Sequence, residues 1–158
     1  MYKITFSLIT LSIFSLSGLA NSITKHINIG ANNSTINSKT GNGFDISYGA
    51  TRVWDSGIIG VFDMNYGQAS INNTTANNYG GELKLGYDYE DIAVYGIGSG
   101  IGQSYGKTEA YGFGYGAGIE YTPFKDIGVG VDYKSYSMTS TTNEYDFETT
   151  KVYLKIIF

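Results

Sequence analysis

The sequence contains no cysteine, one proline, one histidine and one tryptophan among 158 residues. Without cysteine, the chain has no disulfide, thiol nucleophile or thiolate metal ligand. Only 15% of the residues are charged and the formal net charge is −4 at pH 7, a composition that disfavours binding to nucleic acid. The spacings of zinc proteases, EF-hands and P-loops do not occur. We therefore expect no cofactor, no metal site and no nucleic-acid partner.

Long apolar runs are also missing beyond the first residues of the chain. Residues 1–20 carry an early cation at Lys3, an uncharged and largely apolar middle, and small residues at the end, Gly18-Leu19-Ala20. This pattern is typical of a secretory signal peptide. A membrane anchor is the alternative, but the segment is short and rich in Ser and Thr. We expect a cleaved signal peptide at 1–20 and one domain at 21–158.

Glycine and tyrosine are in excess, with 22 and 15 residues. In residues 111–121, YGFGYGAGIEY, aromatic or aliphatic residues take the odd positions and glycine takes the even positions through 118. Because successive side chains of a β-strand point to opposite faces, this alternation predicts a strand with one bulky and one bare face. A flexible low-complexity tract is the alternative, but the alternation continues through Tyr121.

The same alternation predicts eight strands of roughly ten residues each. They cover residues 23–32, 43–54, 58–68, 78–89, 92–102, 109–122, 127–138 and 148–158. Tight turns at 55–57, 90–91 and 123–126 alternate with polar loops expected at 33–42, 69–77, 103–108 and 139–147. An even number of such strands is typical of a transmembrane barrel, which must close because lipid cannot satisfy an open sheet edge. The expected fold is all-β, an eight-stranded antiparallel up-and-down transmembrane β-barrel.

Apolar and charged residues occupy opposite faces of most predicted strands. With lipid outside, the aromatic rows face outward, and glycines and charges share the narrow lumen. A water-soluble barrel of the lipocalin kind is the alternative, and it would turn the rows of tyrosines into an internal cavity. The strand at 92–102 leaves its orientation open, because Tyr95 and Ile97 favour an outward odd face whereas Ile92 and Val94 favour the opposite.

The predicted inward face carries charges of both signs. Charged groups in a narrow lumen must pair or stay hydrated, and antiparallel pairing should bring Asp63 near Glu82 or Lys84. Two interpretations remain open, a charge network that fills the lumen or a narrow pore lined by the same groups. The expected lumen residues are Asp45, Asp63, Glu82, Lys84, Asp88, Glu120, Asp132, Lys134, Lys151 and Lys155, with His26 as a further candidate.

The last strand, V-Y-L-K-I-I-F, ends on an aromatic residue preceded by alternating apolar residues. Together with the signal sequence and the amphipathic strands, it makes the mature chain resemble the small eight-stranded outer-membrane β-barrel proteins, the OmpA/OmpX-like and opacity-type porin family. The resemblance implies a bacterial outer-membrane protein with both termini in the periplasm and in contact with outer-membrane lipid and lipopolysaccharide. It implies that the barrel-assembly machinery reads Val152, Leu154, Ile156 and Phe158. Tyrosines expected at the membrane interfaces are Tyr48, Tyr66, Tyr87, Tyr89, Tyr121 and Tyr133.

The resemblance implies a structural or surface-interaction, adhesin-like role in which outside loops contact an extracellular ligand. A narrow small-solute porin is one alternative. A lipid-modifying outer-membrane enzyme is another, but lipid A deacylases resemble H-x-S on a strand, and here Asn28 follows His26 in that position. We therefore expect no enzymatic activity and no catalytic residue.

Overall fold

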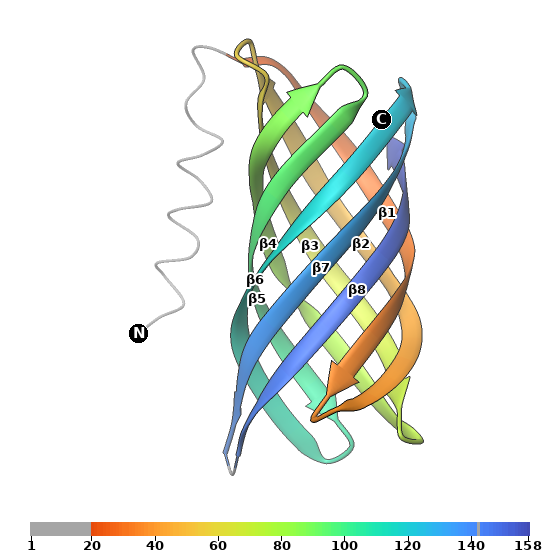
Figure 1. Cartoon of the computed structure of the whole chain (residues 1–158), viewed down its shortest axis with the longest axis vertical. Helices are drawn as coiled ribbons and strands as arrows, with labels where there is room; N and C mark the ends of the chain where they lie inside the picture. The colour runs from red at the N-terminus through yellow and green to blue at the C-terminus, as the bar shows by residue number, and fades with distance from the viewer. Residues whose placement is uncertain (1–19, 142) are drawn as a thin grey trace.

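The computed structural model describes residues 20–141 and 143–158, which form a closed barrel of eight antiparallel strands (Figure 1). Each strand pairs with the next, and β1 pairs with β8, where Ile27 lies opposite Ile156. The strands are β1 (Ala20–Ile36), β2 (Lys39–Trp54), β3 (Ile58–Ile71), β4 (Thr74–Tyr89), β5 (Ile92–Tyr105), β6 (Thr108–Phe124), β7 (Ile127–Ser140) and β8 (Glu144–Ile157). The predicted fold class is confirmed.

Residues 1–19 lie outside the described part of the chain, so the signal peptide at 1–20 stays a prediction. Within the described residues, no helix is long and apolar enough to cross a bilayer.

Short connections join the strands at both ends, which corrects the prediction of four long loops. The β1–β2 turn is Asn37 and Ser38, and the β3–β4 turn is Asn72 and Asn73; their φ angles are 48°, 64°, 50° and 60°. Two central residues with positive φ form the tight hairpin turn that asparagine tolerates. The polar segments expected as loops at 33–42, 69–77, 103–108 and 139–147 therefore mostly continue the strands. They are polar because they face water, not because the chain there is irregular.

The strands are longer than a membrane requires. Strands of 14–17 residues, rising about 3.3 Å per residue at a tilt of about 40°, give a barrel roughly 35–43 Å tall. The lipid-facing apolar band of an outer-membrane barrel is only about 25 Å tall. One end of the barrel must therefore project into water. We call the end with Phe158 and the 55–57, 90–91 and 125–126 turns the terminus end, and the opposite end the far end.

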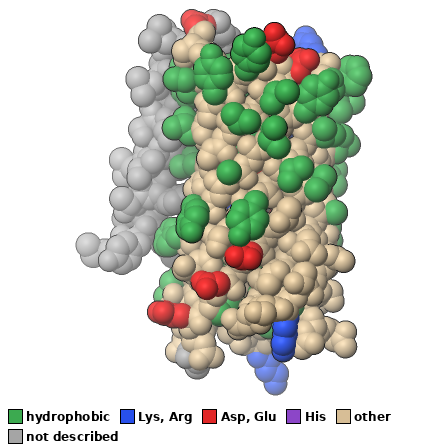
Figure 2. Space-filling model, in the orientation of Figure 1, with side chains coloured by type: hydrophobic (Ala, Val, Ile, Leu, Met, Phe, Trp, Pro, Cys, Tyr) green, Lys and Arg blue, Asp and Glu red, His purple; other side chains and the backbone are tan. Residues whose placement is uncertain are grey.

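The outer wall divides into two zones along the barrel axis. From the terminus end, outward side chains are apolar over most of the wall, a zone that we call the apolar band; Ile29, Met64, Leu85, Tyr115 and Leu154 belong to it. Figure 2 shows apolar side chains over the upper part of one face and mostly uncharged polar side chains and backbone below. The polar collar at the far end consists of Asn33, Thr35, Thr40, Asn42, Gln68, Ser70, Thr75, Asn77, Ser104, Glu109, Ser135, Ser137, Thr139, Asp146 and Glu148.

The lumen changes from mainly polar to apolar at the level where the outer wall changes from apolar to polar. Inside the polar collar lies an apolar cluster, which we call the far-end core: Ile36, Ala69, Ile71, Ala76, Ile101, Ala110, Tyr136, Met138 and Phe147. Inside the apolar band the lumen is mainly polar and charged, although Ile59, Val61, Ala93, Tyr95 and Ile97 form a second buried apolar cluster. The far end thus has the apolar interior and polar exterior of a water-soluble barrel, and the rest has the polar interior and apolar exterior of a membrane barrel.

The orientation of β5 is now settled. Tyr95 and Ile97 are buried in the lumen, whereas Ile92 and Val94 are exposed on the outer wall, so the even face points outward. No bulge occurs along the pairing of β5 with β4 or β6. The outward positions 96, 98, 100 and 102 are all glycine, which is why alternation alone was ambiguous there.

The glycine face of β6 points into the lumen, as the alternation in residues 111–121 predicts. A Cβ added to Gly118 would collide with the carboxylate of Asp132 and the ring of Tyr95. By contrast, a Cβ added to Gly98 on the outer wall of β5 would meet no atom within 4 Å. Inward glycines on β6 therefore make room for side chains that cross the lumen.

Gly118→Ala should destabilise the barrel by about 1–3 kcal/mol, because overpacking displaces buried side chains. Gly98→Ala is the matched control and should leave stability unchanged or raise it slightly, by up to about 1 kcal/mol. Urea unfolding of the refolded protein in detergent micelles, followed by tryptophan fluorescence, measures both. Equal effects of the two substitutions would contradict the packing described for the lumen.

Candidate functional site

A ring of hydrogen bonds and ion pairs runs around the lumen inside the apolar band. On one side, Thr51 Oγ1 lies 3.3 Å from His26 Nδ1, and His26 Nε2 lies 2.7 Å from Asp63 Oδ1. Lys84 Nζ then joins Asp63 Oδ2, at 3.3 Å, to Asp132 Oδ2, at 2.9 Å. The ammonium group of β4 thus lies between carboxylates of β3 and β7.

The other side of the ring contains two tyrosines. Tyr95 donates to Asp132 Oδ1 at 2.8 Å, and its hydroxyl lies 2.6 Å from that of Tyr153. Tyr153 donates to Glu120 Oε2 at 3.0 Å, and Lys155 donates to Glu120 Oε1 at 2.8 Å. Lys155 Nζ also lies 3.4 Å from Thr51 Oγ1, and this contact closes the ring. All eight strands contribute at least one group to it.

Two further ion pairs cross the lumen beside the ring. Lys134 of β7 pairs with Glu82 of β4, which also accepts a hydrogen bond from Asn65. Lys151 of β8 pairs with Asp45 of β2 at 2.8 Å. All four charged residues are buried, so each charge has lost most of its water and depends on its partner.

The structure places nine of the ten residues expected in the lumen, Asp88 excepted, as buried members of these ion pairs. Asp63 lies opposite Glu82 in the β3–β4 ladder and within reach of Lys84, so both expected neighbours are close. Asp88 is half-buried near the terminus end and takes no part in the ion pairs among the described residues. His26, the further candidate, is fully buried within the ring.

Sequence reasoning missed the uncharged members of the ring. Tyr95 was not expected in the lumen, because Tyr95 and Ile97 favoured an outward odd face for their strand. Tyr153 alternates in phase with Lys151 and Lys155, but it was not counted among the charged groups expected to pair there. Thr51 follows the inward parity of Asp45 and Ser47 and could have been found in the same way.

Lys84→Met should destabilise the barrel by about 3–5 kcal/mol, because it leaves two buried carboxylates, Asp63 and Asp132, without their shared cation. Lys125→Met, at the exposed β6–β7 turn, is the control and should change stability by less than about 0.5 kcal/mol. Samples are heated to a series of temperatures before detergent gel electrophoresis, and the readout is the temperature at which the folded band disappears. Equal unfolding temperatures of the two variants would show that the lumen ion pairs do not stabilise the barrel.

Asp63, His26 and Thr51 follow the order carboxylate, imidazole and hydroxyl, as in a hydrolase triad. The imidazole is fully buried, however, and Thr51 is only 6% exposed. Its hydroxyl also lies within reach of Lys155 inside the ring. The arrangement therefore holds three strands together and offers no open position for a substrate. Among the described residues, no group of acids and histidine is placed to hold a metal ion.

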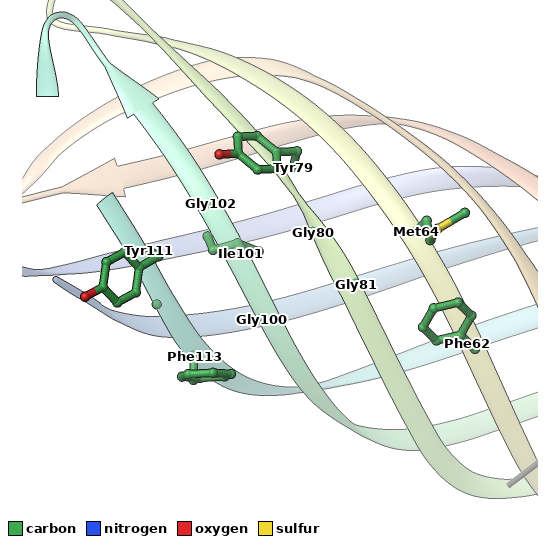
Figure 3. Close-up of a pocket in the computed structure, with 11 residues that line it drawn as sticks. Phe62, Met64, Tyr79, Gly80, Gly81, Gly100, Ile101, Gly102, Tyr111 and Phe113 are labelled. Atoms are coloured by element: carbon green, nitrogen blue, oxygen red, sulfur yellow. The ribbon is translucent and has the colours of Figure 1, made fainter. Parts of the chain in front are cut away.

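A shallow groove of about 570 Å³ lies on the outer wall within the apolar band (Figure 3). Gly81, Gly100 and Gly102 form part of its floor, and Met64 and Phe113 flank it from opposite sides. The described residues that line it include no Ser, Thr, His, Asp or Glu. Tyr79 and Tyr111 supply the side-chain hydroxyl groups of this lining.

Comparison with known families identifies the class of protein that this geometry defines. Residues 6–158 match the model of the outer membrane protein beta-barrel domain, and the chain belongs to that family. It is therefore an outer-membrane β-barrel protein of bacteria. No curated protein sequence matches the chain.

Solved structures of similar fold include Neisserial surface protein A and Ail. Neisserial surface protein A is 11% identical, with a TM-score of 0.65 over 88% of this chain and 99% of that one. Ail, the attachment invasion locus protein of Yersinia pestis, is 14% identical, with a TM-score of 0.58 over 85% of this chain and 98% of that one. At these identities the likeness establishes the shared barrel fold.

Proposed function

We propose that the protein is a non-enzymatic outer-membrane barrel that does not conduct solutes and displays its far end as a rigid, polar contact surface outside the cell. The observation that carries this proposal is the reversal of polarity along the wall. Apolar residues cover the zone that lipid would surround, and polar residues cover a projecting zone with its own apolar core.

The polar collar supports placing the far end outside and both termini in the periplasm. Outer-membrane barrels keep short turns on the periplasmic side and extend on the outside. Here the turns are short at both ends, but only the far end carries strands beyond the apolar band. The six expected interface tyrosines are all exposed on the outer wall, where a ring and a hydroxyl can meet lipid and water together.

The lumen contacts support a barrel that does not conduct. Charged and aromatic side chains contact one another across the lumen, and the far-end core closes the lumen between them and the far end of the barrel. An internal void next to Lys134 and Tyr136 has a volume of about 20 Å³, which holds about one water molecule. A solute would have to break several buried ion pairs to pass.

The collar surface supports an adhesin-like role with an uncharged or weakly charged partner. Cross-strand hydrogen bonds such as Asn33 to Asn42 and Gln68 to Asn77 hold its polar side chains in fixed rows. Ail has been solved in complex with the heparin analogue sucrose octasulfate. This collar instead carries the acids Glu109, Asp146 and Glu148, so it disfavours a sulfated ligand.

The C-terminal residues support recognition by the barrel-assembly machinery. Val152, Leu154, Ile156 and Phe158 are exposed on the outer wall, and Phe158 exchanges backbone hydrogen bonds with Lys25 at the seam of β1 and β8. Before β8 pairs with β1, the last strand therefore presents this apolar row beside an unpaired backbone edge.

Single cysteines test the orientation, because the native chain has none. A membrane-impermeant maleimide should label Ser137→Cys, on the polar collar, in intact cells. Asp91→Cys, at a terminus-end turn, is the matched control and should be labelled only after the outer membrane is permeabilised. The reverse pattern would show that the far end faces the periplasm and would refute the proposal.

Planar-bilayer recording tests the closed lumen. The purified native protein should give no steady open current, because the buried ion pairs fill the lumen. Steady conductance that shifts with Lys134→Ala, but not with Lys107→Ala in an exposed turn, would establish a pore and refute this part of the proposal.

A further inference from the structure

A cup opens at the far end of the barrel, between the far-end core and the surrounding water. Its volume is about 260 Å³, and residues from three of the far-end hairpins line it. Ile36 of the far-end core lines its base, and Tyr105 and Tyr145 of its lining pack against that core. The cup lies beyond the apolar band, in the zone where the outer wall is polar, so water fills and surrounds it.

Both tyrosines that line the cup bond their hydroxyls to other groups of the protein. Tyr145 donates its hydroxyl to Gln103 Oε1 at 2.7 Å, and Tyr105 donates to the carbonyl of Ile71 at 3.3 Å. These bonds fix two aromatic rings in place before any ligand arrives. Aromatic side chains with placed polar groups beside them are a recurrent lining of small-ligand sites, and five of the eight residues that line this cup are polar.

The polar groups of the lining are mainly uncharged. Asn37 and Thr108 lie at two of the turns, and Ser140 is bonded to the backbone of Asn143 at 2.8 and 3.0 Å, which steadies the β7–β8 connection. Amide and hydroxyl groups both donate and accept hydrogen bonds. Glu144 also borders the cup, but it continues the outward set of Asp146 and Glu148 on β8. The site therefore suits a ligand that has many hydroxyl groups and no charge.

We propose that this cup binds one neutral pyranose ring, as a free sugar or as the end of a glycan. The apolar face of the sugar stacks on the tyrosine rings, and its hydroxyls bond to Asn37, Thr108 and Asn143. The cup has a volume of about 260 Å³ and opens to water, so one ring fits inside it while the remaining sugars of a glycan would lie outside. The inference rests on the proposed function in one respect, that the far end faces outside the cell.

A small organic cation is the competing ligand, because aromatic rings beside a carboxylate also bind ammonium groups. Only Glu144 could supply that carboxylate from the lining. Replacement of this one residue therefore separates the two ligands. An acyl chain fits less well, since the cup opens into water beyond the apolar band.

The test uses the refolded mature chain in micelles and saturation-transfer NMR with two probes, a panel of methyl pyranosides and choline. We expect transfer from the protein to the ring protons of at least one pyranoside. Tyr145→Leu should weaken binding about tenfold or more, and Thr108→Val about two- to tenfold, the loss of one hydrogen bond. Lys125→Gln, in the exposed β6–β7 turn at the opposite end, is the control and should leave binding unchanged, whereas Glu144→Gln tests the cation alternative. The gel-mobility difference between unheated and boiled samples verifies that each variant is folded.

The outcomes separate this inference from the proposed function. Binding of choline alone, lost in Glu144→Gln, would overturn the sugar site in favour of a cation site. Absence of binding by every pyranoside in a folded protein would also overturn it, while labelling of Ser137→Cys in intact cells would leave the proposed function standing. Pyranoside binding combined with labelling of Asp91→Cys alone would refute the proposed orientation and retain the site.

Discussion

Backbone amides and carbonyls within lipid find no water, so each must bond within the sheet. The pairing of β1 with β8 meets this requirement by removing both edges. Closure with eight strands also fixes a narrow interior, and a narrow interior permits charged groups only where partners lie opposite them. The ring through Lys84 and Asp132 and the inward glycines of β6 are both consequences of that small diameter.

The reversal of polarity has one physical cause. Where the outside medium is lipid, the wall is apolar and polar groups gather within; where it is water, the arrangement inverts. Along β7, Val131 and Tyr133 face outward with Asp132 and Lys134 inside, whereas Ser135 and Ser137 face outward with Tyr136 and Met138 inside. On β7 the outer wall thus changes from apolar to polar between Tyr133 and Ser135, which marks the expected edge of the membrane.

Most of the fold could be predicted from the period-two alternation of apolar and polar residues in the sequence. It identified eight strands and the inward set of charges, because strand geometry requires neighbouring residues to face opposite sides. It failed at 33–42 and 69–77, where Asn, Ser and Thr look like loop residues but lie in extended hairpins facing water. It was ambiguous on β5, where outward glycines give no signal. The partners within the ring depend on contacts across the lumen, such as Tyr95 with Tyr153, which sequence spacing does not encode.

The lumen ring includes His26 of the first strand and Tyr153 and Lys155 of the last. It therefore cannot be completed until the final strand has docked against the first. A chain with seven strands in place would lack the ammonium groups of Lys151 and Lys155, so Asp45 and Glu120 would have no cation to pair with when the lumen closes to water. The contacts that β8 makes in the ring therefore form only in the closed barrel, and they stabilise it relative to any form that lacks the last strand.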